Sequence, residues 1–202
     1  EEIVEKTNAD RKVGETILTS TGTKLENIGV IVIDNATKKI ESNELVKVAD
    51  LKDEDADTKA AADAIIADVD ARLGAVFAKS EVELNGKKAP QGNRDSETNL
   101  GDLITDALLW YATKDGNLDV ADDHIVAITN GGGIRATINA GDITMKDINT
   151  VLPFGNTVAV VYITGDKLLE ALEAATQATP EALGGFPQVA GINFSLFTGA
   201  AY

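Results

Sequence analysis

The sequence predicts an α+β fold, with α/β as the alternative class, in which helices pack on a mixed sheet. Apolar residues recur at helical spacing in several separate segments, and short β-branched runs lie between those segments without strict alternation of helix and strand. The chain has 202 residues, of which 44% are hydrophobic and 25% are charged. This composition and length suit one globular domain, or one domain and a piece of another.

The first elements predicted along the chain are strands, within residues 14–40. Residues 17–19 and 29–33 are apolar and rich in β-branched side chains, and residues 35–39 form a polar turn that leads into Ile40. A hairpin or meander of about 30 residues is too small to be stable by itself. We therefore interpret it as a strand-rich remnant of a larger domain.

A long helix is predicted over residues 51–79 and would connect this remnant to the rest of the chain. Its apolar residues recur at a spacing of four, at Ile65, Val69, Leu73 and Phe77. The acidic residues 53–57 suit a helix N-terminus, where the helix dipole favours negative charge. Their alternation is superficially like a calcium loop, but Thr58 and Ala64 stand where that loop needs Gly and Glu. Helix capping is the favoured interpretation.

The remaining elements follow from the same patterns. A helix is predicted where Leu100, Leu103, Ile104, Leu108 and Tyr111 share one face, and Gly116 ends it. The other predictions are, in chain order, a strand at 81–84 before an Asn85-Gly86 turn, a strand at 125–129, a strand at 157–164, a helix at 165–178, a loop at 184–191 and a last strand at 192–197.

Charge and residue content exclude several classes of function. A net charge of −15 opposes binding to nucleic acid polymers and to anionic membranes. No apolar stretch approaches the roughly 20 residues of a membrane span. The absence of Cys excludes thiolate chemistry, and the single His124 argues against a Ser-His-Asp triad or a multi-His metal site. Asp122-Asp123-His124 is interpreted as a solvated turn. Because the chain begins at Glu1 without a leader, we expect a mature or shortened piece of a protein.

The segment from Asn130 to Arg135 is the strongest candidate for a site. Three consecutive glycines are usually placed where the backbone needs positive φ or where another group approaches it closely. Asn130 and Arg135 offer an amide and a fork of donors to a polar ligand. A tight turn with Arg135 in solvent explains the same residues equally well. A dinucleotide fingerprint would require a helix directly after Gly133, and residues 136–141 are typical of a helix break instead.

Two further segments could contribute to a ligand site. Phe154 lies between Pro153 and Gly155, so its ring is either a core plug, the more common case, or a platform on which a base stacks, worth about 1–3 kcal/mol per base. Arg94 could pair with Asp95 or Glu97 at the surface, or it could point into a cleft.

Taken together and in order, four segments resemble the C-terminal domain of the 5'-nucleotidase family. They are Arg94 to Ala107, Asn130 to Arg135, Leu152 to Asn156, and Gly184 to Gly191. Residues 14–40 resemble the closing strands of the metallophosphoesterase domain that precedes it in that family. The resemblance implies a domain division into the tail of that domain at 1–50, a connector helix at 51–79, and a substrate-binding domain at 80–202 that is incomplete at its C-terminus.

The resemblance implies a secreted hydrolase of nucleotides, located outside the cell, at its surface or in the periplasm. Arg94, Asn130, Gly132 and Arg135 would bind the ribose or base, and Phe154 would stack on the base. Two divalent metal ions in the N-terminal domain would activate water and polarise the phosphate. Those metal ligands, a second aromatic ring and a Gly-Gly-Asp segment are absent from this sequence, so we expect no catalytic or metal-binding residue in it and no activity from it alone. The alternative is a non-catalytic module that binds nucleosides or a surface partner.

Overall fold

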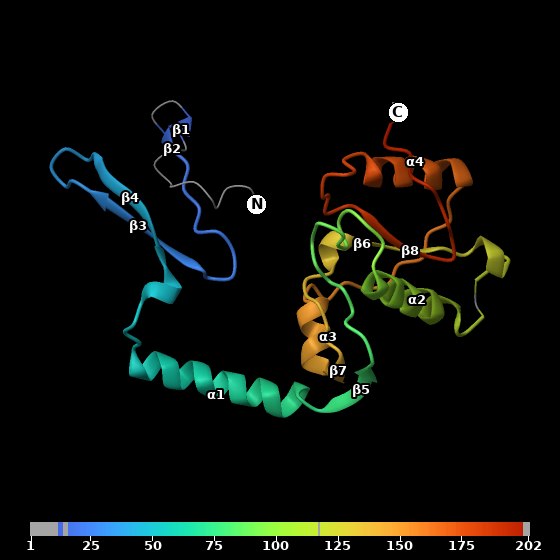
Figure 1. Ribbon diagram of the computed structural model, residues 1–202, viewed down its shortest axis with the longest axis horizontal. Coiled ribbons are helices and arrows are strands. Elements are labelled where there is room, and N and C mark those ends of the chain that lie inside the picture. The colour runs from blue at the N-terminus through green and yellow to red at the C-terminus, as the bar shows by residue number, and fades with distance from the viewer. Residues whose placement is uncertain (1–11, 14–15, 117, 200–202) are drawn as a thin grey trace. The chain divides into compact units, whose positions relative to one another are not determined.

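The computed structural model describes residues 12–13, 16–116 and 118–199, and the chain divides into two compact units, residues 1–65 and 66–202. In the N-terminal unit, β1 (Lys12–Val13) pairs with β2 (Thr16–Ile17), and β3 (Asn27–Ile33) pairs with β4 (Ile40–Lys47). Both pairs are antiparallel, and a short 3-10 helix, η3 (Val48–Asp50), follows β4 (Figure 1). The predicted hairpin is confirmed.

The turn of this hairpin is closed by Asp34. Its Oδ1 accepts hydrogen bonds from the backbone N–H of Thr37 at 2.5 Å and from the Thr37 hydroxyl at 2.7 Å. These bonds stabilise the carboxylate and hold the pKa of Asp34 below its ordinary value. The strands beyond the turn remain open to solvent: among the residues of this unit whose burial is described, only Asn43 is buried.

The connector helix is shorter than the sequence predicts. α1 spans Ala56–Leu73, and Asp55 begins it by accepting a hydrogen bond from the Thr58 N–H at 2.8 Å, which confirms the predicted helix capping. The prediction that the helix continues to residue 79 is wrong. Beyond Gly74, the β-branched and aromatic residues of β5 (Val76–Ser80) pair with β7 (Gly141–Thr144), since a strand partner is available there. No helix in the described part of the chain is long and apolar enough to cross a membrane.

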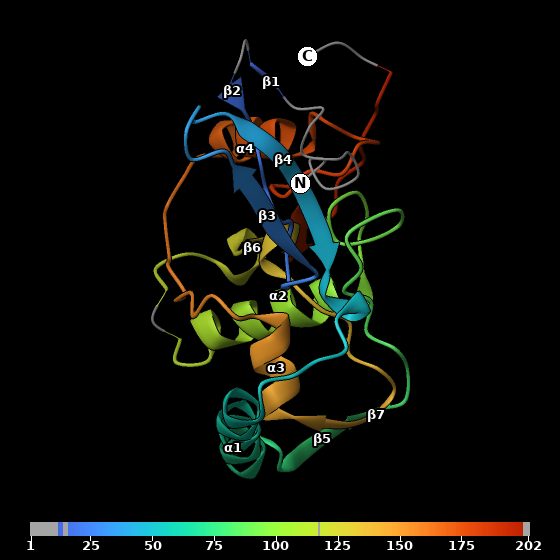
Figure 2. The same ribbon diagram turned by 90° about the vertical axis from the view of Figure 1, so that its left-hand side faces the viewer.

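The C-terminal unit is built around α2 (Asn99–Thr113), which packs on a strand pair. β6 (Ala127–Asn130) and β8 (Pro187–Ala190) are antiparallel neighbours, and α2 contacts both of them (Figures 1 and 2). Thr98 caps α2, with its side-chain oxygen accepting from the Gly101 N–H at 3.1 Å. The predicted helix after residue 98 is confirmed, as is the strand that ends at Asn130.

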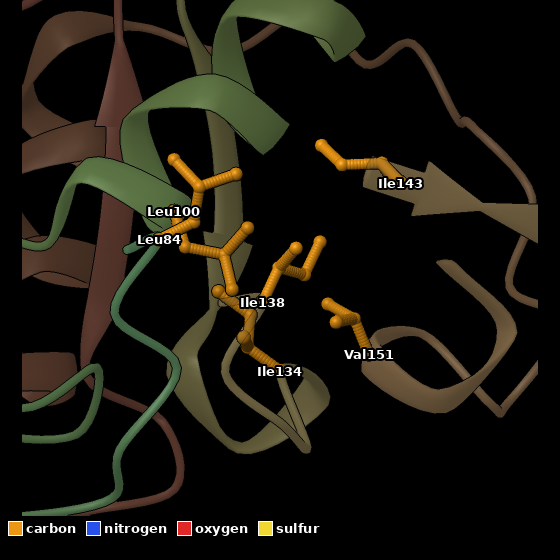
Figure 3. Packing of buried hydrophobic residues seen from close by; sticks show 6 residues of the cluster. All are labelled: Leu84, Leu100, Ile134, Ile138, Ile143 and Val151. Atoms are coloured by element: carbon orange, nitrogen blue, oxygen red, sulfur yellow. The ribbon is translucent and has the colours of Figure 1, made fainter. Parts of the chain in front are cut away.

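Shorter elements complete this unit. They are η4 (Asp122–His124), η5 (Gly131–Gly133), α3 (Met145–Val151) and α4 (Gly165–Thr176). The core lies where α2, α3 and the residues just after η5 converge. Figure 3 shows its buried side chains, which are Leu84, Leu100, Ile134, Ile138, Ile143 and Val151. Ile134, the residue before Arg135, thus belongs to the core and is 1% exposed.

The α+β class is confirmed, but the sheet differs from the prediction. Among the described residues, the strands form two-stranded antiparallel sheets, β1–β2, β3–β4, β5–β7 and β6–β8, and no mixed sheet. The strands predicted at 157–164 and 192–197 are not formed, because no described segment pairs with their β-favouring residues.

Two neighbouring predictions are corrected as well. Residues 81–84 form no full strand, and only Leu84 is bridged, to Ile138. The segment at 184–191, predicted as a loop, contains β8. Pro187 begins that strand, a position where a missing N–H is tolerated.

Candidate functional site

The glycine loop, residues 130–135, is attached through its backbone to a segment far along the chain. The Gly131 N–H donates to the Phe186 carbonyl at 2.8 Å, and the Gly132 N–H donates to the Gly184 carbonyl at 2.8 Å. The Asn130 side-chain amide donates to the same Gly184 oxygen at 3.1 Å. The first two glycines of the loop therefore have defined packing partners, while Asn130 and Arg135 at its two ends are exposed.

Close approach explains two of the three glycines. A Cβ on Gly131 would overlap the backbone carbonyl of Asn93, and a Cβ on Gly132 would come within 2.8 Å of the Gly184 oxygen. On Gly133 the nearest heavy atom would be the Asn130 Oδ1 at 3.5 Å, an ordinary contact. The glycine run was predicted to allow a close approach, and the approaching group is the protein's own backbone.

Arg135 and Phe154 come together at the end of this loop. The Arg135 guanidinium carbon lies 5.7 Å from the centre of the Phe154 ring, within the range of a cation–π contact. Nη1 of Arg135 donates to the Gly132 carbonyl at 3.2 Å, and its backbone N–H donates to Val151 at 2.8 Å. Phe154 is 60% exposed, which contradicts the core-plug interpretation. A cation and an aromatic face are thus presented side by side at the surface.

Arg94 lies in a third loop, residues 91–98, that packs against the glycine loop. Its neighbour Asn93 is fully buried, and the Asn93 amide nitrogen donates to the carbonyls of Gly86 at 3.1 Å and Ile134 at 3.2 Å. The Arg94 carbonyl accepts from the Leu183 N–H at 2.9 Å. Arg94 itself is half-buried, and its loop is fixed beside Ile134, one residue before Arg135.

An open hollow of about 1210 Å³ adjoins these loops. Asn130, Gly133 and Phe154 line it together with one face of α2 and residues 156–165. Arg94, Gly132 and Arg135 do not line this hollow, and Arg135 contacts the lining residue Phe154. The structure thus places Asn130 and Phe154 at the hollow and Arg135 beside Phe154, and it does not bring Arg94 to the hollow.

Sequence reasoning missed three residues that build this arrangement, namely Asn93, Gly184 and Gln188. None is an obvious ligand, since two are buried amides and one acts through its backbone oxygen. A signal was available for Gln188, a lone amide between the apolar residues Phe186 and Val189. A polar side chain in such a run has to find hydrogen-bond partners inside the protein.

Acidic residues near this site do not form a metal centre. Among the described residues, no group of three or more His, Cys, Asp or Glu side chains could hold a metal ion. Burial, with the charges of Glu97 and Asp106, raises the pKa of Asp102 on α2 above its ordinary value. His124 and Asp123 are mostly exposed, as expected for a solvated turn.

The backbone conformation after Gly133 contradicts the dinucleotide-binding hypothesis. The following residues are irregular and then enter β7, and the next α-helix in the described chain begins only at Met145. A dinucleotide loop needs a helix N-terminus directed at the pyrophosphate immediately after its glycines.

Curated relatives match more than half of the chain. The trifunctional nucleotide phosphoesterase protein YfkN of Bacillus subtilis is 43% identical over 116 residues, which are 57% of this chain and 7% of that protein. The snake venom 5'-nucleotidase of Crotalus adamanteus is 37% identical over 118 residues, 56% of this chain and 20% of that protein. The chain thus spans a fifth or less of the length of these relatives.

A solved structure and a family model agree with these relatives. The crystal structure of a 5'-nucleotidase precursor from Thermus thermophilus superposes with a TM-score of 0.60 at 34% identity, covering 82% of this chain and 32% of that one. The family model of the 5'-nucleotidase C-terminal domain matches residues 76–200, a range that includes α2, the glycine loop, Phe154 and β8. Because the family model matches more than half of its residues, the chain belongs to the 5'-nucleotidase C-terminal domain family.

Proposed function

We propose that this chain is the nucleoside-recognition part of a secreted, metal-dependent nucleotide phosphohydrolase of the 5'-nucleotidase or 2',3'-cyclic phosphodiesterase type. The observation that supports this most directly is the pairing of an exposed aromatic ring with a cation, Phe154 with Arg135, at the end of a loop that also presents Asn130. A nucleoside offers a flat aromatic base and a ribose rich in hydroxyls, which match such a set of groups.

Each proposed contact follows from the chemistry of its side chain. Phe154 would stack on the base, and Asn130 and Arg135 would hydrogen-bond to the base or the ribose hydroxyls. Arg94 would add a second guanidinium fork from the neighbouring loop. Gly132 contributes by its lack of a side chain, because a Cβ would meet Gly184 and the Asn130 amide.

Hydrolysis would require groups beyond the described residues of this chain. We propose that residues 1–50 are the tail of a metallophosphoesterase domain, 51–79 a connector and 80–202 the substrate domain, and that two divalent ions in the rest of the first domain supply the activated water. The described residues do not fit a metal site, so no catalytic step is assigned to them. A location outside the cytoplasm is supported by relatives such as the snake venom enzyme.

Nucleoside binding by the purified chain tests the recognition role. Isothermal titration with adenosine and AMP should show binding, and Phe154→Ala should weaken it about tenfold, the loss of one stacked base at 1–3 kcal/mol. Phe77→Ala is the matched control, since Phe77 on β5 is exposed to a similar extent, 58% against 60%. Equal affinity for the Phe154 and Phe77 variants would remove Phe154 from the site.

Kinetics of the complete enzyme test the same assignment. Arg135→Ala should raise KM more than it lowers kcat, because a contact to the nucleoside is made equally in the ground state and the transition state. A selective fall in kcat would contradict that role. The chain alone should release no phosphate from AMP in the presence of Mn²⁺ or Zn²⁺, and metal-dependent release would show that it contains a catalytic centre.

A further inference from the structure

Gln188 on β8 is a buried amide whose hydrogen bonds all lead to one loop. At 1% exposure, its Nε2 donates to the carbonyls of Asn93 at 3.2 Å and Ser96 at 2.7 Å. Its Oε1 accepts from the Thr98 N–H at 3.1 Å. Both N–H groups and the carbonyl oxygen of the amide are thereby used, across 90 to 95 positions of sequence.

These three backbone partners bracket Arg94. Asn93 immediately precedes it, and Ser96 and Thr98 lie between it and the start of α2. The Arg94 carbonyl accepts the Leu183 N–H at 2.9 Å, so the loop is also attached to the residues just before β8. Four hydrogen bonds therefore join the Arg94 loop (residues 91–98) to the 183–188 segment.

The same segment also binds the glycine loop. Gly184 accepts from Asn130 and Gly132, and Phe186 accepts from Gly131, at 2.8 to 3.1 Å. The loops that contain Arg94 and Arg135 are thus both hydrogen-bonded to the 183–188 segment. A shift of that segment would change the positions of both.

The shape of the site favours glutamine at position 188. Gly101 packs directly on its side chain, and a Cβ on Gly101 would overlap Oε1. A glutamate there would direct a carboxylate oxygen at the carbonyls of Asn93 and Ser96, where two donors are needed. A methionine would have a similar length but would leave three backbone groups, buried or partly buried, without this partner.

We propose that Gln188 is a positioning residue for nucleoside binding, which acts by holding the Arg94 loop in register with the glycine loop. The proposal rests on the proposed function for its ligand. It adds a residue that contacts no nucleoside and sets affinity through Arg94.

A double-mutant cycle tests this coupling. The dissociation constant for adenosine is measured by titration calorimetry for the wild-type chain, Gln188→Met, Arg94→Ala and the double variant. Gln188→Met should weaken binding about tenfold in the wild type and less than twofold when Arg94 is already alanine, because residues that act through one another are non-additive. Equal factors in both backgrounds, or an unchanged dissociation constant in folded Gln188→Met, would overturn the proposal.

Thr176→Val is the control for general loss of a buried hydrogen bond. Its hydroxyl is buried and donates to the Leu172 carbonyl at 2.8 Å within α4, not to the Arg94 loop, the glycine loop or the 183–188 segment. It should lower the melting temperature without changing the dissociation constant. A Thr176 variant that binds as weakly as Gln188→Met would assign the effect to stability alone and overturn the proposal.

Gln188→Glu provides a second test should the methionine variant not fold. Burial raises the pKa of such a carboxyl group, and its neutral form regains one O–H donor for the Ser96 carbonyl. Its affinity for adenosine, relative to the wild-type chain at the same pH, should improve at least threefold between pH 7.5 and pH 5. A constant ratio would overturn the proposal.

Hydrogen exchange separates failure of this proposal from failure of the proposed function. A wild-type chain that binds neither adenosine nor AMP would refute the proposed function. Exchange at the N–H groups of Thr98 and Leu183 then tests whether Gln188 holds the loop, and a Gln188 variant should accelerate it at least tenfold. Unchanged exchange there would overturn the positioning role independently of any ligand.

Discussion

The hairpin of the N-terminal unit and the core of the C-terminal unit are both rich in isoleucine, but the side chains are exposed in the hairpin and buried in the core. In β3, the side chains of Ile28, Ile31 and Ile33 are 47%, 44% and 56% exposed. In the C-terminal unit, Ile134 and Ile138 are 1% and 4% exposed, because α2 and α3 supply side chains that cover them. Local β-propensity is sufficient to form a ladder, but burial needs a second layer. The proposed nucleoside-binding residues all lie in the C-terminal unit, which has a second layer.

Deleting an apolar side chain in each region should give the largest contrast. Leu100→Ala removes a core side chain that is 2% exposed and should lower the free energy of unfolding by about 3 kcal/mol through lost burial and a cavity. Ile31→Ala in β3 should change it by about 0.5 kcal/mol or less. Urea denaturation measures both, followed by fluorescence of Trp110, the single tryptophan and part of α2, for the C-terminal unit and by circular dichroism of the whole chain for the hairpin. Equal losses would show that the hairpin is as well packed as the core.

Adding one methyl group to a glycine sharpens the comparison. Gly131→Ala forces a Cβ against the Asn93 carbonyl, whose own residue is buried, and should destabilise the chain by about 2 kcal/mol. Gly29→Ala in the hairpin meets only the Thr21 methyl at 3.2 Å, which can move aside. Gly133→Ala is the control within the same loop. Thermal unfolding should place Gly131→Ala well below the other two, and three similar melting temperatures would refute the close-packing account.

The same contrast explains which features could be predicted from sequence. Helix α2 and the Asn130 strand end were predicted because periodicity and a following glycine run are local signals. The strand predicted at 157–164 has strong local propensity, yet it lacks a partner among the described residues. Conversely, the Gly and Pro residues near β8 predict a loop, but the segment forms a strand because it pairs with β6 over four residue pairs. Pairing is a non-local property that one segment does not encode.

The candidate site shows the same division. Arg94, Asn130, Arg135 and Phe154 could be selected from residue type and motif order, because each offers a group that suits a nucleoside. Gln188 was not singled out, since its partners Asn93 and Thr98 lie about 90 positions away and only the fold brings them together. Its role is defined by geometry rather than by chemistry that a ligand would recognise.

A capping change should have an intermediate, pH-dependent effect. The Thr144 side chain and backbone donate to Asp147 at 2.6 and 2.8 Å in the capping box of α3, and these bonds lower the pKa of Asp147. A carboxyl whose pKa is depressed by folding stabilises the fold above its ordinary pKa and loses that contribution as pH falls through the folded value. Thr144→Val should therefore cost about 1 kcal/mol at pH 7.

Measurements at low pH identify the cause of this loss of stability. The difference between Thr144→Val and the wild-type chain should shrink below the ordinary Asp pKa of 3.8, as Asp147 becomes protonated in both. Urea denaturation at pH 7 and pH 3 measures it. A difference that is the same at both values would assign the loss to the hydroxyl packing alone, with no part played by the carboxylate.

The smallest expected effect is a gain in stability at the start of α2. The pKa of Asp102 is raised by burial and by the charges of Glu97 and Asp106, so its ionised form is disfavoured by folding. Such a group destabilises the fold above its folded pKa and has no effect below its ordinary pKa, where it is neutral in both states. Asp102→Asn should add about 0.3 kcal/mol at pH 7, in the range of one like-charge helical pair, and nothing at pH 3. A loss of stability at pH 7 would mean that attraction to the helix N-terminus outweighs burial and repulsion, contrary to the direction of the pKa shift.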